Sequence, residues 1–250
     1  MNQGRLSTAL GGPGAPGALG GERRATDRAP GLAGVVLCGG RSSRMGRPKA
    51  WLPFGGEALL QRVVRRLGEA AWPIAVVAAP GQELPPLAEG VLVVRDPEEG
   101  RGPLQGIAAG LEAVAPLAER AYVSATDAPF LHPAFVRRLA DLQAGDHAVA
   151  VPWADGHHHP LGAVYACSVR GDAAALLAQG TLRLSSLFER ARTLVAGPEL
   201  LLADPRLREA DPALRSLRNL NTPEDYAAAL RELDAAEDPA PGAGGPAGRP

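Results

Sequence analysis

The sequence predicts an α/β protein built on a three-layer, doubly wound and mainly parallel sheet. Short continuous apolar runs alternate along the chain with longer segments whose apolar residues have helical spacing. Strands without polar alternation are typical of parallel sheets, because helices cover both faces of such sheets. Polar residues follow several of these runs directly, and in this fold class ligands bind beyond the carboxyl ends of the strands.

The first half of the chain carries the clearest pattern. Four apolar runs predict strands at residues 35–37, 74–77, 91–94 and 121–123. Two helices are expected at residues 57–69 and 104–114, where apolar positions recur every three or four residues. The second of these helices follows Gly102-Pro103, a common start signal.

The second half is less regular. Helices are expected at residues 134–142, 172–178 and 184–191. Two strands, at residues 148–151 and 161–165, flank a turn that contains His157 to His159, and we expect them to add to the sheet in antiparallel fashion. A final helix begins with Thr222 as N-cap and Pro223 at the first position, and extends through Leu233.

The composition is that of a single globular domain. We expect this domain at residues 31–235 of the 250, between disordered tails at 1–30 and 236–250 that are rich in Gly, Pro and Ala. A net charge of −1 argues against a nucleic-acid partner. No apolar run reaches the roughly 18 residues of a membrane helix, and no signal-peptide core is present, so we expect a cytoplasmic location and no membrane partner.

The candidate site starts with the loop from Cys38 to Lys49. Its glycines allow backbone amides to approach an anion, and its basic residues can neutralise phosphate charge. Lys49 is the sole lysine among 26 basic residues, which suggests that the bulkier guanidinium fork would not serve at this position. The loop has neither the Walker spacing nor that of the dinucleotide fingerprint.

Two carboxylates also follow predicted strands. Asp96 comes after the run ending at Val94, and Asp127 comes after the run ending at Val123. Because parallel strands end at one rim of a sheet, these carboxylates and the Gly-rich loop should converge there. Asp127 is the expected Mg²⁺ ligand, since this ion prefers hard oxygen donors. A structural turn role for Asp127 before Pro129 is the alternative.

Several further polar groups are expected to be structural. Cys38 and Cys167 are too few for a disulfide framework or a metal cluster. The three adjacent histidines at 157–159 cannot all point the same way in a strand-flanking turn, so a solvated turn is favoured over a metal site. The pairs Arg65-Arg66 and Arg137-Arg138 are expected on solvated helix faces.

A set of motifs resembles the nucleotidyltransferases with a nucleoside-triphosphate-transferase fold, and among them most closely the molybdenum cofactor guanylyltransferases. The motifs are Leu37-Cys38-Gly39-Gly40, Ser43-Arg44-Met45-Gly46 with Lys49, Gly102-Pro103-Leu104 with Gly106, Asp127 with Pro129-Phe130-Leu131, His159-Pro160-Leu161, and Asn219-Leu220-Asn221-Thr222-Pro223-Glu224-Asp225. Together they span nearly the whole expected domain.

The resemblance implies transfer of GMP from GTP to the terminal phosphate of molybdopterin, with release of pyrophosphate and with Mg²⁺ as cofactor. It assigns Lys49, Arg44 and Asp127 to catalysis, and it names molybdoenzymes or cofactor-insertion proteins as candidate partners. It assigns nucleotide binding to Leu37, Cys38, Gly39, Gly40, Lys49, Asp96 and Asp127. It implies that Asn219, Asn221 and His159 bind the pterin.

Two departures from the family pattern bear on the choice of nucleotide. Pro48 stands before Lys49 where the guanylyltransferases usually have aspartate, which motivates a cytidylyltransferase acting on the same cofactor. Ala78-Ala79-Pro80 lacks the asparagine often found near the base, so backbone groups should read guanine. A sugar-phosphate nucleotidyltransferase also stays open, as does a nucleotide-binding module without catalysis, although the presence of Lys49, Asp96 and Asp127 opposes the module.

Overall fold

The computed structural model describes residues 28–39, 48–96 and 100–237 of the chain. The expected tails therefore fall almost entirely outside the described residues. An eight-stranded sheet has the order β10-β7-β9-β6-β1-β4-β5, with β8 paired to β7. The strands of this sheet are β1 (Leu32–Leu37), β4 (Ile74–Ala78), β5 (Leu92–Arg95), β6 (Arg120–Ala125), β7 (Val149–Ala154), β8 (His157–His158), β9 (Gly162–Ala166) and β10 (Thr193–Ala196).

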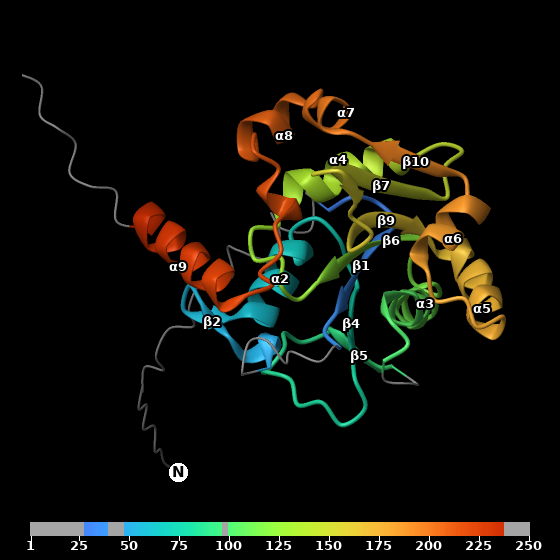
Figure 1. The fold of residues 1–250 in the computed structure, drawn as a ribbon, viewed down its shortest axis with the longest axis horizontal. Helices are drawn as coiled ribbons and strands as arrows, with labels where there is room; N and C mark the ends of the chain where they lie inside the picture. The colour runs from blue at the N-terminus through green and yellow to red at the C-terminus, as the bar shows by residue number, and fades with distance from the viewer. Residues whose placement is uncertain (1–27, 40–47, 97–99, 238–250) are drawn as a thin grey trace, which may run out of the picture.

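Helices cover both faces of the sheet (Figure 1). The larger helices are α2 (Leu59–Gly68), α3 (Pro103–Val114), α4 (Pro133–Gln143), α5 (Arg170–Ala178), α6 (Leu184–Arg190) and α9 (Pro223–Glu237). Helices α2 and α4 pack on one face, and α3, α5 and α6 pack on the other. The predicted three-layer, doubly wound fold is confirmed.

Alternation along the central strands separates the two cores. In β1, Leu32 and Val36 face the core under α2 and α4, whereas Ala33 and Val35 face the core under α3. Strand β1 pairs in parallel with both β4 and β6, and β4 pairs in parallel with β5. Four strands therefore end at the same rim, as the apolar runs predicted.

The antiparallel addition is also confirmed. Strand β9 pairs antiparallel with β6 and β7, and β10 then adds in parallel at the outer edge. Between β7 and β8, Asp155 and Gly156 both have positive φ angles, 52° and 78°, which form the tight turn of a hairpin. The expected histidine turn is thus partly a short strand.

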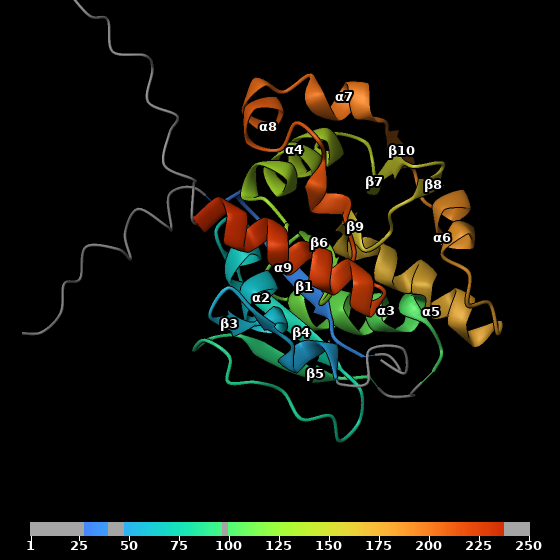
Figure 2. The same cartoon turned by 60° about the vertical axis from the view of Figure 1, so that its left-hand side comes forward.

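The carboxyl-terminal helix covers a third, smaller core. Figure 2 shows α9 in front of α2 and the small hairpin of β2 (Pro53–Phe54) and β3 (Glu57–Ala58). Leu220 and Ala229 are buried there together with Phe54. The helix begins as predicted, because Thr222 Oγ1 accepts from Asp225 N at 3.1 Å. In return, Asp225 Oδ2 accepts a hydrogen bond from Thr222 N.

One expectation about the core was wrong, and one about the surface held only for Arg65, which is exposed. Strand β5 lies at the sheet edge, where Leu92 and Val93 are 36% and 48% exposed, so its apolar run is not buried on both faces. The arginine pairs are only partly solvated. Arg66, Arg137 and Arg138 donate to the backbone carbonyls of Leu131, Glu69 and Leu200, respectively, and so tie helices and loops together.

Elements with short or exposed apolar faces were not predicted. They are the β2–β3 hairpin, strand β10, the short helices α7 (Pro198–Leu202) and α8 (Pro205–Ala210), and the 3-10 turns η1 (Lys49–Trp51), η2 (Cys167–Val169) and η3 (Arg215–Leu217). No helix in the described part of the chain is both long and apolar enough to cross a bilayer.

Close packing of α3 on the sheet depends on a glycine. A Cβ built on Gly110 would lie 2.3 Å from Val35 Cγ1 and 3.2 Å from Val77 Cγ2. We expect Gly110→Ala to lower the free energy of unfolding by about 2 kcal/mol, because overpacking outweighs the gain in helix propensity. Urea unfolding would measure this change.

Gly68→Ala is the matched control in a helix on the opposite face. The Cβ of an alanine at this position would lie 3.6 Å from Ile74 Cδ1, which is ordinary van der Waals contact. The free energy of unfolding should therefore be unchanged or slightly higher. If Gly110→Ala proved as stable as Gly68→Ala, the result would contradict the close packing of α3 on β1.

Candidate active site

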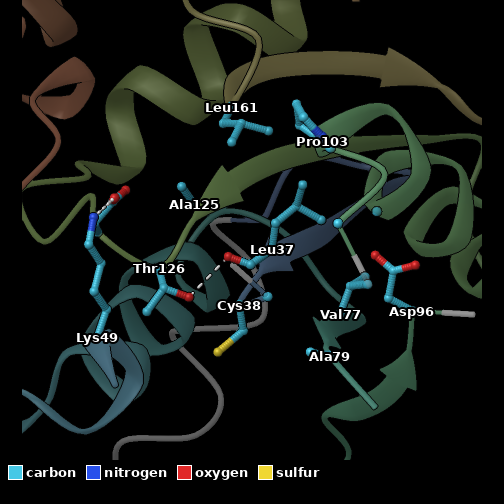
Figure 3. A pocket seen from close by; sticks show the side chains of 15 residues that line it. Leu37, Cys38, Lys49, Val77, Ala79, Asp96, Pro103, Ala125, Thr126 and Leu161 are labelled. Atoms are coloured by element: carbon cyan, nitrogen blue, oxygen red, sulfur yellow. Dashed lines mark hydrogen bonds and ion pairs between the residues drawn. The ribbon is translucent and has the colours of Figure 1, made fainter. Parts of the chain in front are cut away.

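A cavity of about 580 Å³ opens at the rim where β1, β4, β5 and β6 end. Each of these strands contributes lining residues at or just beyond its last residue (Figure 3). They include Leu37, Cys38 and Gly39 from β1, Val77 and Ala79 from β4, Asp96 from β5, and Ala125, Thr126 and Asp127 from β6. The convergence predicted from the parallel sheet is therefore present.

Lys49 and Asp127 form an ion pair at one end of this cavity. Lys49 Nζ lies 2.6 Å from Asp127 Oδ2, and their side chains are 21% and 15% exposed. Lys49 opens η1, while the backbone at Asp127 is fixed because its carbonyl accepts from Leu220 N at 2.9 Å. Two residues 78 positions apart in the sequence thus lie together. This contact is the one on which an enzymatic interpretation of the sequence depends.

The second oxygen of Asp127 has the character of a ligand. Asp127 Oδ1 is buried and has no hydrogen-bond partner within the described residues. Burying a carboxylate oxygen without a partner costs free energy, which a bound cation would offset. The carboxylate of Asp96 lines the same cavity, although no group of three potential metal ligands occurs in the described ranges. The residues present fit a cation held by one carboxylate and by phosphate oxygens.

The opposite end of the cavity is lined mainly by apolar side chains. Leu37, Val77 and Ala79 give it apolar walls, and Asp96 is its carboxylate. Cys38 lies between the two ends of the cavity, and burial raises the pKa of its thiol, opposed by hydrogen bonds with Thr126 and Gln82. Cys38 therefore remains a neutral thiol near neutral pH.

The amino end of α3 closes the cavity on the side of Asp96. Gly102 has a φ of 79° and precedes Pro103, and both residues line the cavity. Gly106 allows the helix to approach β1, since a Cβ there would lie 3.2 Å from Leu37. The Gly-Pro-Leu motif thus has a structural explanation, which is the placement of this helix start beside the cavity.

Two predicted site residues, Gly40 and Arg44, lie outside the described residues. Several residues at the site were given no role from the sequence, among them Gln82, Arg95 and Leu161. Gln82 and Arg95 hydrogen-bond to the backbone at the ends of β1 and β4, and Leu161 lines the cavity from the β8–β9 connection. Leu161 belongs to the predicted His159-Pro160-Leu161 motif, whereas no sequence pattern singled out Gln82 or Arg95.

A second cavity of about 210 Å³ adjoins the first through Leu161, which lines both. It brings together two of the residues predicted to bind the pterin, His159 and Asn219. Asn221 is exposed and does not line this cavity. Its backbone N–H donates to Asp225 Oδ2 instead. The expected pterin residues are thus divided between a cavity and a helix start.

The three histidines alternate in direction, as predicted. His157 and His159 lie ring to ring at 4.2 Å, while His158 contacts Trp153 and Phe188. Burial lowers the pKa of His159, and a hydrogen bond with Ala154 O opposes this effect. In the neutral imidazole Nε2 donates to the Ala154 carbonyl at 3.2 Å, which leaves Nδ1 as an acceptor for a ligand.

Solved structures with the same fold support the architecture. The molybdopterin-guanine dinucleotide biosynthesis protein A from Archaeoglobus fulgidus superimposes with a TM-score of 0.64 at 24% identity, covering 81% of this chain and 98% of that chain. The 2-C-methyl-D-erythritol 4-phosphate cytidylyltransferase from Thermus thermophilus does so with a TM-score of 0.58 at 18% identity, covering 80% and 98%. At these identities the likeness establishes the fold alone.

Sequence comparison narrows the assignment. Residues 34–194 match the family model of the MobA-like NTP transferase domain. A Mycobacterium tuberculosis protein named "Probable molybdenum cofactor guanylyltransferase" is 41% identical over 174 residues, which cover 68% of this chain and 85% of the relative. A Mycobacterium avium protein of the same name is 40% identical over 162 residues, covering 63% and 81%. With these matches, and with the fold and rim site described above, the chain belongs to the MobA-like NTP transferase family.

Proposed function

We propose that this protein transfers GMP from GTP to the terminal phosphate of molybdopterin, producing the guanine dinucleotide form of the cofactor and pyrophosphate. The observation that carries the proposal is the contact between Lys49 and Asp127 at the rim of the sheet, 2.6 Å between Nζ and Oδ2. Family membership and the names of relatives about 40% identical support the choice of substrates.

In this reaction an oxygen of the molybdopterin phosphate attacks the α-phosphorus of GTP. A new phosphorus–oxygen bond forms while the bond from the α-phosphorus to the bridging oxygen breaks, and the electron pair leaves with pyrophosphate. Both partners are anions and charge develops on the leaving group, so positioning and charge stabilisation provide most of the catalysis. The Lys49 ammonium is placed to neutralise phosphate charge.

Asp127 is the residue proposed to hold Mg²⁺, through the buried oxygen that has no partner in the described chain. When bound, the ion withdraws charge from the phosphate oxygens and so favours attack. Asp96, at the far end of the cavity, is suited to ribose hydroxyls because a carboxylate accepts their hydrogen bonds. Arg44 and Gly40 remain proposed phosphate and base contacts by resemblance.

The acceptor is proposed to enter through the smaller cavity. His159 and Asn219 line it, and Leu161 connects it with the nucleotide cavity. A pterin ring presents several donors and acceptors, which an imidazole and an amide can match. Asn221 remains a proposed pterin contact by resemblance. A cytoplasmic location, where both substrates would be available, and delivery of the product to molybdoenzymes or cofactor-insertion proteins complete the proposal.

The direct test supplies the purified chain with molybdopterin, Mg²⁺ and each nucleoside triphosphate in turn. We expect pyrophosphate and a guanine dinucleotide product with GTP, and little product with CTP or ATP. Faster turnover with CTP would replace the proposal by a cytidylyltransferase, the activity that Pro48 motivates. Tight GTP binding with no pyrophosphate release would indicate a nucleotide-binding module without catalysis.

The two asparagines offer a test of the acceptor cavity. We expect Asn219→Ala to raise the KM for molybdopterin by about tenfold, since one buried hydrogen bond to a ligand contributes about 1.4 kcal/mol, while the KM for GTP is unchanged. Steady-state kinetics with each substrate varied would measure both values. Asn221→Ala, on an exposed side chain nearby, should have a smaller effect. If Asn219→Ala raised the KM for GTP as much as the KM for molybdopterin, the result would argue against a separate acceptor site.

A further inference from the structure

A glutamine beyond β4 joins the ends of two strands that line the nucleotide cavity. Gln82 Oε1 accepts from Ala79 N at 3.0 Å, and Gln82 Nε2 donates to Cys38 O at 3.1 Å. The same Nε2 lies 3.4 Å from Cys38 Sγ. One side-chain amide therefore fixes the backbone after β1 relative to the backbone after β4.

A second side chain holds the same turn from the other side. Arg95, the last residue of β5, donates through Nη1 to Ala79 O at 3.2 Å and to Gln82 O at 2.8 Å. Gly81 has a φ of 69° and allows the chain to turn between these contacts. Residues 79–82 are thus held by side-chain hydrogen bonds from β5 and from within the turn, beyond the last β4–β5 register pair at Ala78 and Arg95.

Charge indicates which part of the nucleotide meets this turn. The Lys49–Asp127 end fits phosphates and a cation, which leaves the other end, with Asp96 and the apolar walls, for the nucleoside. The base must then lie toward Val77 and Ala79, whose small apolar side chains suit a flat ring. At this end Gly39 and Ala79 come close, because a Cβ built on Gly39 would lie 3.5 Å from Ala79 N. A base here meets backbone atoms of both strand ends.

We infer that Gln82 is a positioning residue that sets base selectivity, because it fixes the backbone at Cys38, Gly39 and Ala79 against which the base is read. The inference rests on the proposed function and adds to it the origin of nucleotide choice. Backbone groups discriminate between bases only if they are held in place, since hydrogen bonds weaken steeply with distance and angle. A fixed polar site rejects a base that leaves its groups unpaired.

The chain provides a matched control in Gln61. This residue makes the same kind of bridge, accepting from Ala58 N at 2.8 Å and donating to Pro86 O at 2.7 Å, and it too holds the segment that follows β4. It does not line the nucleotide cavity, and neither of these two hydrogen bonds reaches the end of β1. Gln61→Ala therefore reports the effect of loosening this segment in general.

The experiment measures dissociation constants of wild type, Gln82→Ala and Gln61→Ala for GTP, ATP, CTP and UTP, by calorimetry with magnesium chloride present. We expect Gln82→Ala to lose about tenfold of the preference for the best nucleotide over the others, and Gln61→Ala to keep it. With saturating GTP, kcat of Gln82→Ala should stay within about threefold of wild type. Thermal midpoints of the two variants should be alike.

Gln82→Glu separates the two halves of the bridge. It keeps an acceptor for Ala79 N and loses the donor to Cys38 O, so we expect it to lose selectivity as Gln82→Ala does. Retained preference in both Gln82 variants would overturn the inference. A wild-type preference for CTP would overturn the guanine assignment, while the loss of preference in Gln82→Ala would still support the role of Gln82. Absence of nucleotide binding by wild type would overturn both.

Discussion

Asp127→Asn should lower kcat for pyrophosphate release by about 10³-fold, which corresponds to about 4 kcal/mol of lost transition-state stabilisation. The amide can still accept a hydrogen bond from Lys49, so the variant removes charge and metal affinity while keeping shape. Steady-state release of pyrophosphate with GTP, molybdopterin and varied Mg²⁺ measures the effect. The residual activity should need a higher Mg²⁺ concentration than wild type.

Stability distinguishes this role from a structural one. Asp127 Oδ1 is buried without a partner in the described chain, so removing its charge should leave the free energy of unfolding unchanged or raise it by up to about 1 kcal/mol. A residue that merely shapes the turn before Pro129 would show the opposite result, with stability lost and kcat kept. Near-normal release of pyrophosphate from a folded variant would overturn the metal assignment.

Asp96→Asn is the matched substitution, because it removes the carboxylate at the other end of the cavity. It should raise the KM for GTP by about tenfold and change kcat less, because a ribose contact is made equally in the ground and transition states. If Asp96→Asn and Asp127→Asn had the same profile, the division of the cavity into a phosphate end and a nucleoside end would be wrong.

The site could be predicted where it follows from a rule of the fold. Asp96 and Asp127 are far apart in the sequence, yet both follow apolar runs, and parallel strands place their carboxyl ends at one rim. The same rule places Asp127 at the rim, where it meets Lys49 of η1, which follows the loop after β1. The helix at Pro223 was predicted for a similar reason, since its cap is local in sequence.

The rest depends on contacts that leave no local pattern. Gln82 bonds to a carbonyl 44 residues away, and nothing in its neighbours indicates that partner. The exposed edge position of β5 is set by the sheet order, which the apolar run at 91–94 does not reveal. Helix α8 did carry a start signal, because Asp204 caps it before Pro205, but its few apolar residues gave no periodicity.

Lys49→Arg should lower kcat by about 10²-fold, although the charge is conserved. Lys49 Nζ lies 2.6 Å from Asp127 Oδ2 and, as a point charge, leaves the buried Oδ1 without a partner among the described residues. A guanidinium is a planar fork that pairs with both carboxylate oxygens, so arginine here would occupy the atom that Mg²⁺ needs. The variant should therefore fold as well as wild type and be partly restored by a higher concentration of Mg²⁺.

The control is the opposite substitution, of arginine by lysine, at a neighbouring position. Arg62, on α2, donates to Pro129 O at 3.0 Å close to the same turn, and Arg62→Lys should leave kcat within about threefold of wild type. Only Lys49 would then be sensitive to the exchange of one cation for the other. Since arginine supplies every other basic position of the chain, wild-type activity in Lys49→Arg would mean that the lone lysine survives by chance. A large loss of kcat in Lys49→Arg that Mg²⁺ partly reverses would mean that a lysine is required at this position to leave Asp127 accessible to the ion.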